Sequence, residues 1–179
     1  MVSALPEVLP MSTRKVIFGF DGSNVNAVGK PSLLLTLLNK GEVLDTATIQ
    51  IEAVNSTDKY SRTFASAIDG SLQYYAVTPQ VGGVKKGAAL FLSVHGAGVE
   101  AIGQARAYQS KDWGTLVAAT NRRPRGFNWE DWGRLGALEV LSLSKNTLAP
   151  DPQKIYLTGH SMGGHGTWFL GATYPDKWA

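Results

Sequence analysis

Three short apolar runs in the second half of the chain have the pattern of buried strands. They cover residues 88–94, 115–120 and 155–157. A near-continuous apolar run is typical of a central parallel strand that is covered on both faces of its sheet. Residues 100–109 fit a helix, and apolar positions at helical spacing predict a second helix up to about residue 146, with Asn128 as its N-cap. This alternation predicts right-handed crossovers and a parallel sheet.

The first half of the chain has a different pattern, in which apolar and β-branched residues partly alternate with polar ones. Strands are predicted at residues 14–20, 42–53 and 72–78, and residues 33–38 fit either a strand or a short helix. Residues 55–62 are polar and predict a loop. The chain therefore divides into a loose lead-in (1–12), a β-rich N-terminal region (13–80) and an α/β domain (81–179).

A serine motif directly follows the third buried run. Residues 159–163 read Gly-His-Ser-Met-Gly, which fits G-x-S-x-G, and the residues after them continue as a helix. A serine between a strand and a helix, flanked by glycines that allow close approach, is typical of a nucleophile elbow. The motif therefore predicts Ser161 as a nucleophile. The alternative is a glycine-rich turn between strand and helix in an unrelated α/β protein.

A serine nucleophile also needs donors for the oxyanion, a base and an acid. The N–H of Met162 lies at the start of the predicted helix, where free N–H groups favour negative charge. A second N–H, from Ala97, is predicted in the glycine-rich loop after the first buried run. For that loop, the alternative is a plain turn that ends a strand.

The base and the acid are not found in this chain. His95 lies in the predicted oxyanion loop, His160 lies beside the serine and His165 lies on the following helix, so all three are predicted to be structural. Elbow enzymes place the acid and then the histidine after the serine, but Asp176 is the sole acid there and comes too early. We therefore expect a complementary C-terminal segment, or a second chain, to supply both.

Composition and charge exclude several other classes of function. The formal net charge is +3, and the scattered basic residues make no patch for nucleic acid. The chain has no cysteine, so no thiolate nucleophile or thiolate metal site is expected. No stretch is long and apolar enough to span a bilayer, and neither a metal nor an organic cofactor is needed.

Two further features leave alternatives open. Arg122 and Arg123 follow the second buried run, where they would contact an acidic or polar substrate or belong to a solvated loop. Residues 1–11 do not form a signal peptide as they stand. The compartment is therefore unknown, and secretion or export to the periplasm after removal of a signal is one interpretation.

Taken together, the residues from about 72 to 179 resemble the α/β-hydrolase superfamily, with most similarity to its prolyl-oligopeptidase-like and esterase branch. The resemblance rests on three segments: residues 92–98, residues 151–164, and residues 166–168 together with 174–176. It implies a parallel-sheet α/β-hydrolase fold that is incomplete at the C-terminus and follows a small β-rich region. It also implies Ser161 as the nucleophile, Met162 and Ala97 as oxyanion donors, and an Asp and a His on later strands and loops.

The sequence thus predicts a serine hydrolase that acts on small carboxylic esters through an acyl-enzyme and is inactive as this chain alone. A serine peptidase of the prolyl-oligopeptidase type is an alternative. Such peptidases bring a large propeller, which about 80 residues of N-terminal strands cannot form. A non-catalytic binding module that kept the elbow without its triad is the other alternative.

Overall fold

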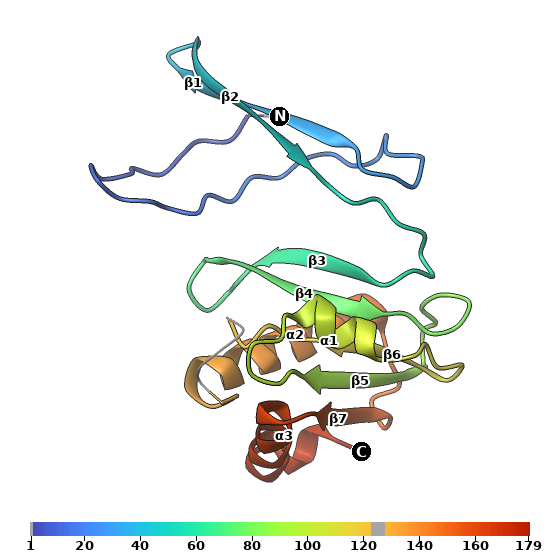
Figure 1. The fold of residues 1–179 in the computed structure, drawn as a ribbon. Helices are drawn as coiled ribbons and strands as arrows, with labels where there is room; N and C mark the ends of the chain where they lie inside the picture. The colour runs from blue at the N-terminus through green and yellow to red at the C-terminus, as the bar shows by residue number, and fades with distance from the viewer. Residues whose placement is uncertain (1, 123–127) are drawn as a thin grey trace. The chain divides into compact units, whose positions relative to one another are not determined.

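The computed structural model describes residues 2–122 and 128–179 (Figure 1). Contacts within the chain define two compact units. The smaller unit contains Phe18–Asn55, and the larger contains Ala4–Ile17 and Ser56–Ala179. No helix in the described ranges is long and apolar enough to cross a membrane. The same ranges hold no cluster of three or more side chains suited to a metal ion.

The smaller unit is built on one antiparallel hairpin. Strand β1 (Ser32–Asn39) pairs with strand β2 (Glu42–Gln50), and Lys40 and Gly41 form the turn between them with φ of 50° and 89°. Glycine adopts such angles without steric penalty, which explains its place in the turn. The run at residues 33–38 is therefore a strand and not a helix.

The larger unit contains a five-stranded sheet in the order β3-β4-β6-β5-β7. Its three parallel strands are β5 (Ala89–Val94), β6 (Gly114–Ala118) and β7 (Ile155–Gly159), with β5 in the middle. Strands β3 (Tyr60–Ala65) and β4 (Leu72–Thr78) add to β6 as an antiparallel edge. The predicted mixed α/β fold with a mostly parallel sheet is confirmed.

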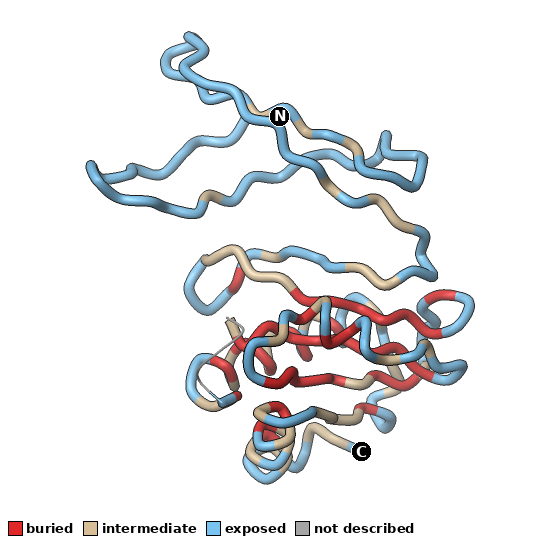
Figure 2. Tube along the Cα trace, viewed as in Figure 1, coloured by how far each residue is buried: buried red, intermediate tan, exposed pale blue. Residues whose placement is uncertain are grey.

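Helices cover both faces of this sheet. Helix α1 (Ala101–Ala107) packs on one face, through Ala101 and Ala105 against Leu116 of β6. Helices α2 (Asp131–Leu148) and α3 (Met162–Thr173) pack on the other, and a short 3-10 helix (Pro175–Lys177) follows. Right-handed crossovers explain this division, because the chain moves from β5 to β6 in one direction and from β6 to β7 in the opposite one. The buried positions lie mainly in this sheet and the segments packed on it (Figure 2).

Three local predictions were wrong. Residues 14–20 form no strand, although their apolar residues suggested one. Strand β3 begins at Tyr60, inside the segment predicted as a polar loop. Helix α2 begins at Asp131 with Glu130 as its N-cap, so Asn128, whose φ is 43°, does not cap it.

Candidate active site

Ser161 occupies a strained turn between β7 and α3. Its φ of 56° and ψ of −119° lie in a region that residues with a side chain rarely adopt. The strand ends at Gly159 and the helix begins at Met162, so only two residues make the turn. Such a tight connection presents the serine at the N-terminus of the helix, where the dipole and free N–H groups favour negative charge.

Two glycines allow the helix to lie this close to the strands. A Cβ on Gly163 would lie 1.9 Å from the carbonyl oxygen of Val94, and one on Gly159 would lie 2.2 Å from the carbonyl oxygen of Gly163. The obstacle is backbone in both cases, and backbone cannot move aside as a flexible side chain can. The glycines of the motif therefore bring α3 against the end of β5.

The loop after β5 lies beside the serine. A Cβ on Gly96 would be 3.4 Å from the Cβ of Ser161. The loop continues as a β-turn in which the N–H of Val99 donates to the carbonyl of Gly96, with φ of 77° at Gly98. Within residues 2–122 and 128–179, neither the N–H of Ala97 nor that of Met162 donates to a protein acceptor. The structure thus brings the loop of Ala97 next to the turn of Ser161 and Met162.

The imidazole of His95 is buried inside the protein. Its Nδ1 lies 2.9 Å from the carbonyl oxygen of Gly96, and its Nε2 lies 2.9 Å from that of Thr120. Because both ring nitrogens face backbone carbonyls and the side chain has 0% exposure, His95 ties the loop after β5 to the loop after β6. This arrangement fits the predicted structural role.

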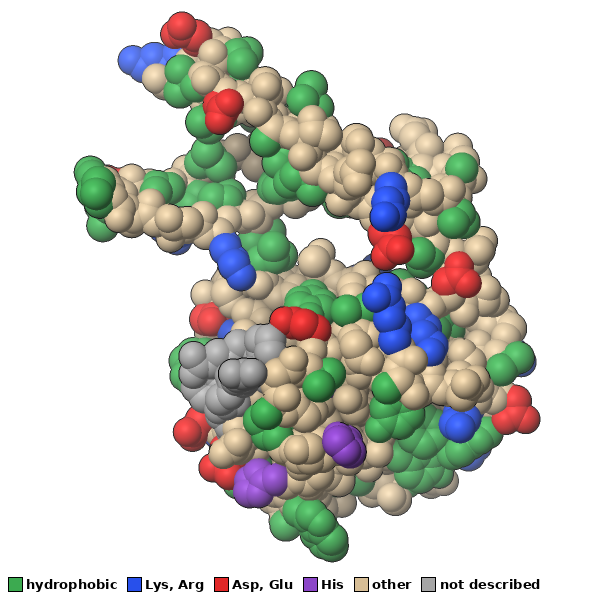
Figure 3. Space-filling model, in the orientation of Figure 1, with side chains coloured by type: hydrophobic (Ala, Val, Ile, Leu, Met, Phe, Trp, Pro, Cys, Tyr) green, Lys and Arg blue, Asp and Glu red, His purple; other side chains and the backbone are tan. Residues whose placement is uncertain are grey.

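The other two histidines are exposed, and histidine side chains are visible at the surface in Figure 3. The Nε2 of His165 lies 2.7 Å from Oε1 of Glu130, which connects α3 to the N-cap of α2. His160 precedes the serine within the turn. The partnership of His165 with Glu130 was not predicted, because the two residues lie 35 positions apart in the sequence.

A tryptophan joins the loop to helix α3. Trp129 has 0% exposure, and its indole N–H donates to the carbonyl of His95 over 3.0 Å. The indole also packs directly on Gly166 of α3. The sequence alone gave no sign of this bond. The signal that could have indicated such a contact is Gly166, a small residue about one turn into α3 that leaves space for a bulky side chain.

Arg122 lies in an ion-pair network of the larger unit. Its side chain is 8% exposed, and its guanidinium lies 2.8 Å from Asp69 and 3.4 Å from Glu139. Hydrogen bonds from the Ser71 side chain and backbone, together with Arg122, lower the pKa of Asp69 from 3.8 to about 2. The two terminal nitrogens of the Arg122 guanidinium are thus bound to protein groups, and its predicted substrate contact stays a prediction. Arg123 lies outside the described residues.

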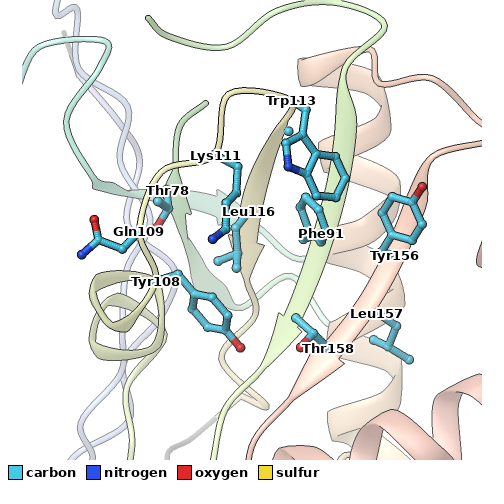
Figure 4. Close-up of a pocket in the computed structure, with 11 residues that line it drawn as sticks. Thr78, Phe91, Tyr108, Gln109, Lys111, Trp113, Leu116, Tyr156, Leu157 and Thr158 are labelled. Atoms are coloured by element: carbon cyan, nitrogen blue, oxygen red, sulfur yellow. The ribbon is translucent and has the colours of Figure 1, made fainter. Parts of the chain in front are cut away.

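A cavity of about 310 Å³ opens on the face of the sheet that carries α1 (Figure 4). Its aromatic lining includes Phe91, Trp113 and Tyr156, and the rings of Phe91 and Tyr156 stack with centroids 5.3 Å apart. Ser161 does not line this cavity. We therefore assign the candidate chemistry to the serine turn.

Comparison with known proteins gives one curated relative and many solved structures. No family model matches the chain. It is 31% identical over 167 residues to poly(3-hydroxyalkanoate) depolymerase C of Paucimonas lemoignei, and this match covers 80% of the chain. The chain spans only 38% of the length of that relative.

Solved structures of hydrolases have the same fold at lower identity. A thermostable esterase is similar with a TM-score of 0.55 and 19% identity, over 78% of this chain and 44% of the esterase. The fluorophosphonate-binding serine hydrolase F of Staphylococcus aureus matches with a TM-score of 0.56 and 18% identity, over 68% and 54% of the two chains. A putative dipeptidyl aminopeptidase IV of Bacteroides ovatus matches with a TM-score of 0.55 and 18% identity, over 68% of this chain and 20% of the aminopeptidase.

Proposed function

We propose that this chain, which has the fold of the α/β-hydrolase superfamily and is related to it, carries the nucleophile and oxyanion half of a serine esterase. The predicted resemblance to that superfamily is confirmed. One observation carries the proposal. Ser161 sits in a strained conformation of positive φ at the start of α3, beside a loop whose Ala97 N–H has no acceptor within the described residues. Such a site suits hydrolysis of a carboxylic ester.

The proposed reaction has two acyl-transfer steps. The Oγ of Ser161 attacks the ester carbonyl carbon, and its proton passes to a base. The N–H groups of Met162 and Ala97 donate to the carbonyl oxygen as it becomes negative. The C–O bond to the alcohol then breaks, and the alcohol leaves with the proton. Water, deprotonated by the same base, attacks the acyl-enzyme and releases the carboxylic acid and the serine.

The base and the acid come, in this proposal, from a complementary C-terminal segment or a second chain. Two observations support this. The ring nitrogens of His95 face backbone carbonyls, and His165 is paired with Glu130. At the edge of the sheet, the N–H of Ala179 donates to the carbonyl of Ile155 over 2.7 Å, so residue 179 already pairs with β7. A strand that continued this pairing would cover the open side of β7.

The kinds of protein that share this fold guide the choice of substrate. One of the similar structures described above is an esterase and another is a serine hydrolase, and the curated relative is a poly(3-hydroxyalkanoate) depolymerase. We therefore favour carboxylic esters over peptides. The likeness to a dipeptidyl aminopeptidase keeps peptide hydrolysis as the second candidate. Comparing an activated ester with the matching anilide, under identical conditions, discriminates between the two.

The test is labelling with a fluorophosphonate, followed by intact mass and peptide mapping. We expect a single adduct on Ser161 in the protein that hydrolyses the ester. Ser161→Ala is expected to remove the adduct and to lower turnover by at least about 10³-fold. Ser61→Ala, at an exposed serine of β3, is the matched control and should change neither. Retained turnover in Ser161→Ala would contradict the nucleophile assignment, and no adduct in any assembly would favour a non-catalytic binding module.

A further inference from the structure

We propose that Trp129 is a positioning residue that holds the two oxyanion donors in register, a role that rests on the proposed function. Trp129 is the largest completely buried side chain in the part of the chain that the structure describes. It approaches the carboxyl edge of the sheet from the turn before α2, where Asn128 and Trp129 have φ of 43° and 66°. A bulky residue rarely adopts such angles unless its surroundings fix it there.

The first contact of Trp129 is with the loop after β5. Its indole N–H donates to the carbonyl of His95, and its ring meets the imidazole edge-on, with centroids 4.9 Å apart. That carbonyl belongs to the peptide that joins His95 to Gly96. Because a peptide unit is planar, a partner on its carbonyl fixes the orientation of the whole plane. The bond thus sets the direction in which the turn with Ala97 begins.

The second contact is with the helix that follows the serine. A Cβ on Gly166 would lie 2.5 Å from the Cγ and Cδ1 atoms of Trp129, so the indole rests directly on the helix backbone. Gly166 lies one turn beyond Met162, and the hydrogen-bonded helix between them is stiff. The indole ring therefore adds, one turn beyond the direct contact at Gly163, a second support that fixes the separation between the loop of Ala97 and the helix of Met162.

This separation matters because an oxyanion site acts through geometry. A donor contributes when its nitrogen lies about 2.7–3.1 Å from the transition-state oxygen, and a misplacement of about 1 Å costs up to about 10²-fold in rate. In the proposed role, Trp129 acts through the loop and the helix and contacts neither Ser161 nor the substrate. Its loss should therefore lower kcat and leave KM nearly unchanged, because the contacts that bind the ground state remain.

The experiment compares Trp129→Phe with Trp168→Phe, whose parent side chain is 82% exposed on α3. Trp129→Phe removes the N–H and keeps an aromatic ring, and both variants are checked for cooperative thermal unfolding. For Trp129→Phe we expect kcat on a soluble ester to fall about tenfold or more, with KM within about twofold. The Val99 amide, which closes the turn, should exchange its hydrogen about tenfold faster. Trp168→Phe should change neither quantity.

The two readouts separate this inference from the proposed function. Unchanged exchange of the Val99 amide overturns the positioning role whether or not the protein is an esterase. If the Val99 amide exchanges faster in Trp129→Phe but kcat equals that of Trp168→Phe, the positioning role is overturned as well. Trp129 would then hold the loop without affecting the reaction. If the parent protein and Ser161→Ala prove equally inactive in an assembly that contains the complementary segment or chain, the proposed function fails, and the exchange result alone decides whether Trp129 holds the loop. Should Trp129→Phe fail to fold, 3-benzothienylalanine at this position keeps the bicyclic shape without the N–H, and the same outcomes apply.

Discussion

Adjacent glycines at the start of α3 allow a sharp test of the packing that positions the serine. Gly163 and Gly164 are neighbours in the same helical turn, but only Gly163 faces the sheet. A Cβ on Gly163 would lie 1.9 Å from the Val94 carbonyl oxygen, well inside the 3.0 Å that real Cβ atoms respect. A Cβ on Gly164 would have no atom within 4 Å. The two substitutions to alanine therefore differ in one respect, the obstruction by β5.

The magnitudes follow from this geometry. Because the obstacle is the backbone of a central strand, Gly163→Ala should destabilise the fold by about 3 kcal/mol or more, the upper end for overpacking. In a protein of this size, that corresponds to a melting temperature lower by roughly 6–12 °C. Gly164→Ala should stabilise the fold by up to about 1 kcal/mol, because alanine is the better helix former.

The assay is urea and thermal unfolding of the two variants and the parent, followed by circular dichroism. The expected order of stability is Gly164→Ala, parent, Gly163→Ala, with similar dependence on urea in all three. If Gly163→Ala unfolds within about 1 kcal/mol of Gly164→Ala, the close approach of α3 to β5 is refuted. The geometric basis for the candidate site would then fail with it.

Two further predictions concern the network around Arg122. Arg122→Met should destabilise the fold by about 3–5 kcal/mol in urea unfolding, because Glu139, whose side chain is 10% exposed, loses its cationic partner; a change confined to KM would instead indicate substrate contact. Asp69 has a folded-state pKa of about 2, below its ordinary 3.8, so its contribution to stability is complete above about pH 4 and is lost as the pH falls towards 2. Asp69→Asn should flatten the stability profile in that window, whereas Asp112→Asn, at an exposed carboxylate before β6, should not.

The sequence was most informative where local pattern and tertiary burial agree. The apolar run closed by Pro79 predicted β4 with its observed limits, residues 72–78. The parallel strands β5 and β6 were located to within two residues, because both are apolar along most of their length. A strand covered on both faces needs such a run, so pattern alone suffices there.

Elements that depend on a partner were not predicted. Strand β3 is mostly exposed and polar, and its hydrogen bonds to β4 give it a strand conformation that its own residues do not demand. Residues 14–20 show the converse, because they are apolar from Val16 onwards but pair with no strand in the described ranges. Local propensity is a weak guide in both situations, since pairing decides the outcome.

The candidate site divides in the same way. The turn at Ser161 and its glycines form one continuous motif, so the sequence displays them together. Trp129 and the carbonyl of His95 are 34 positions apart, and Arg122 meets Asp69 across 53 positions. The sequence pattern does not predict these long-range contacts, because they form only when the sheet brings its loops to one edge.

At Ser161, the stability of the fold and the proposed reactivity favour different residues. Glycine adopts a φ of 56° freely, whereas for serine such a conformation costs on the order of 1–3 kcal/mol. A typical domain has a free energy of unfolding of about 5–15 kcal/mol, so this conformation of one residue lowers the stability by a large fraction. Under the proposed function, Ser161→Gly would therefore stabilise the fold and remove the nucleophile in the same step. Selection for thermal stability alone would then favour variants that have lost the proposed activity.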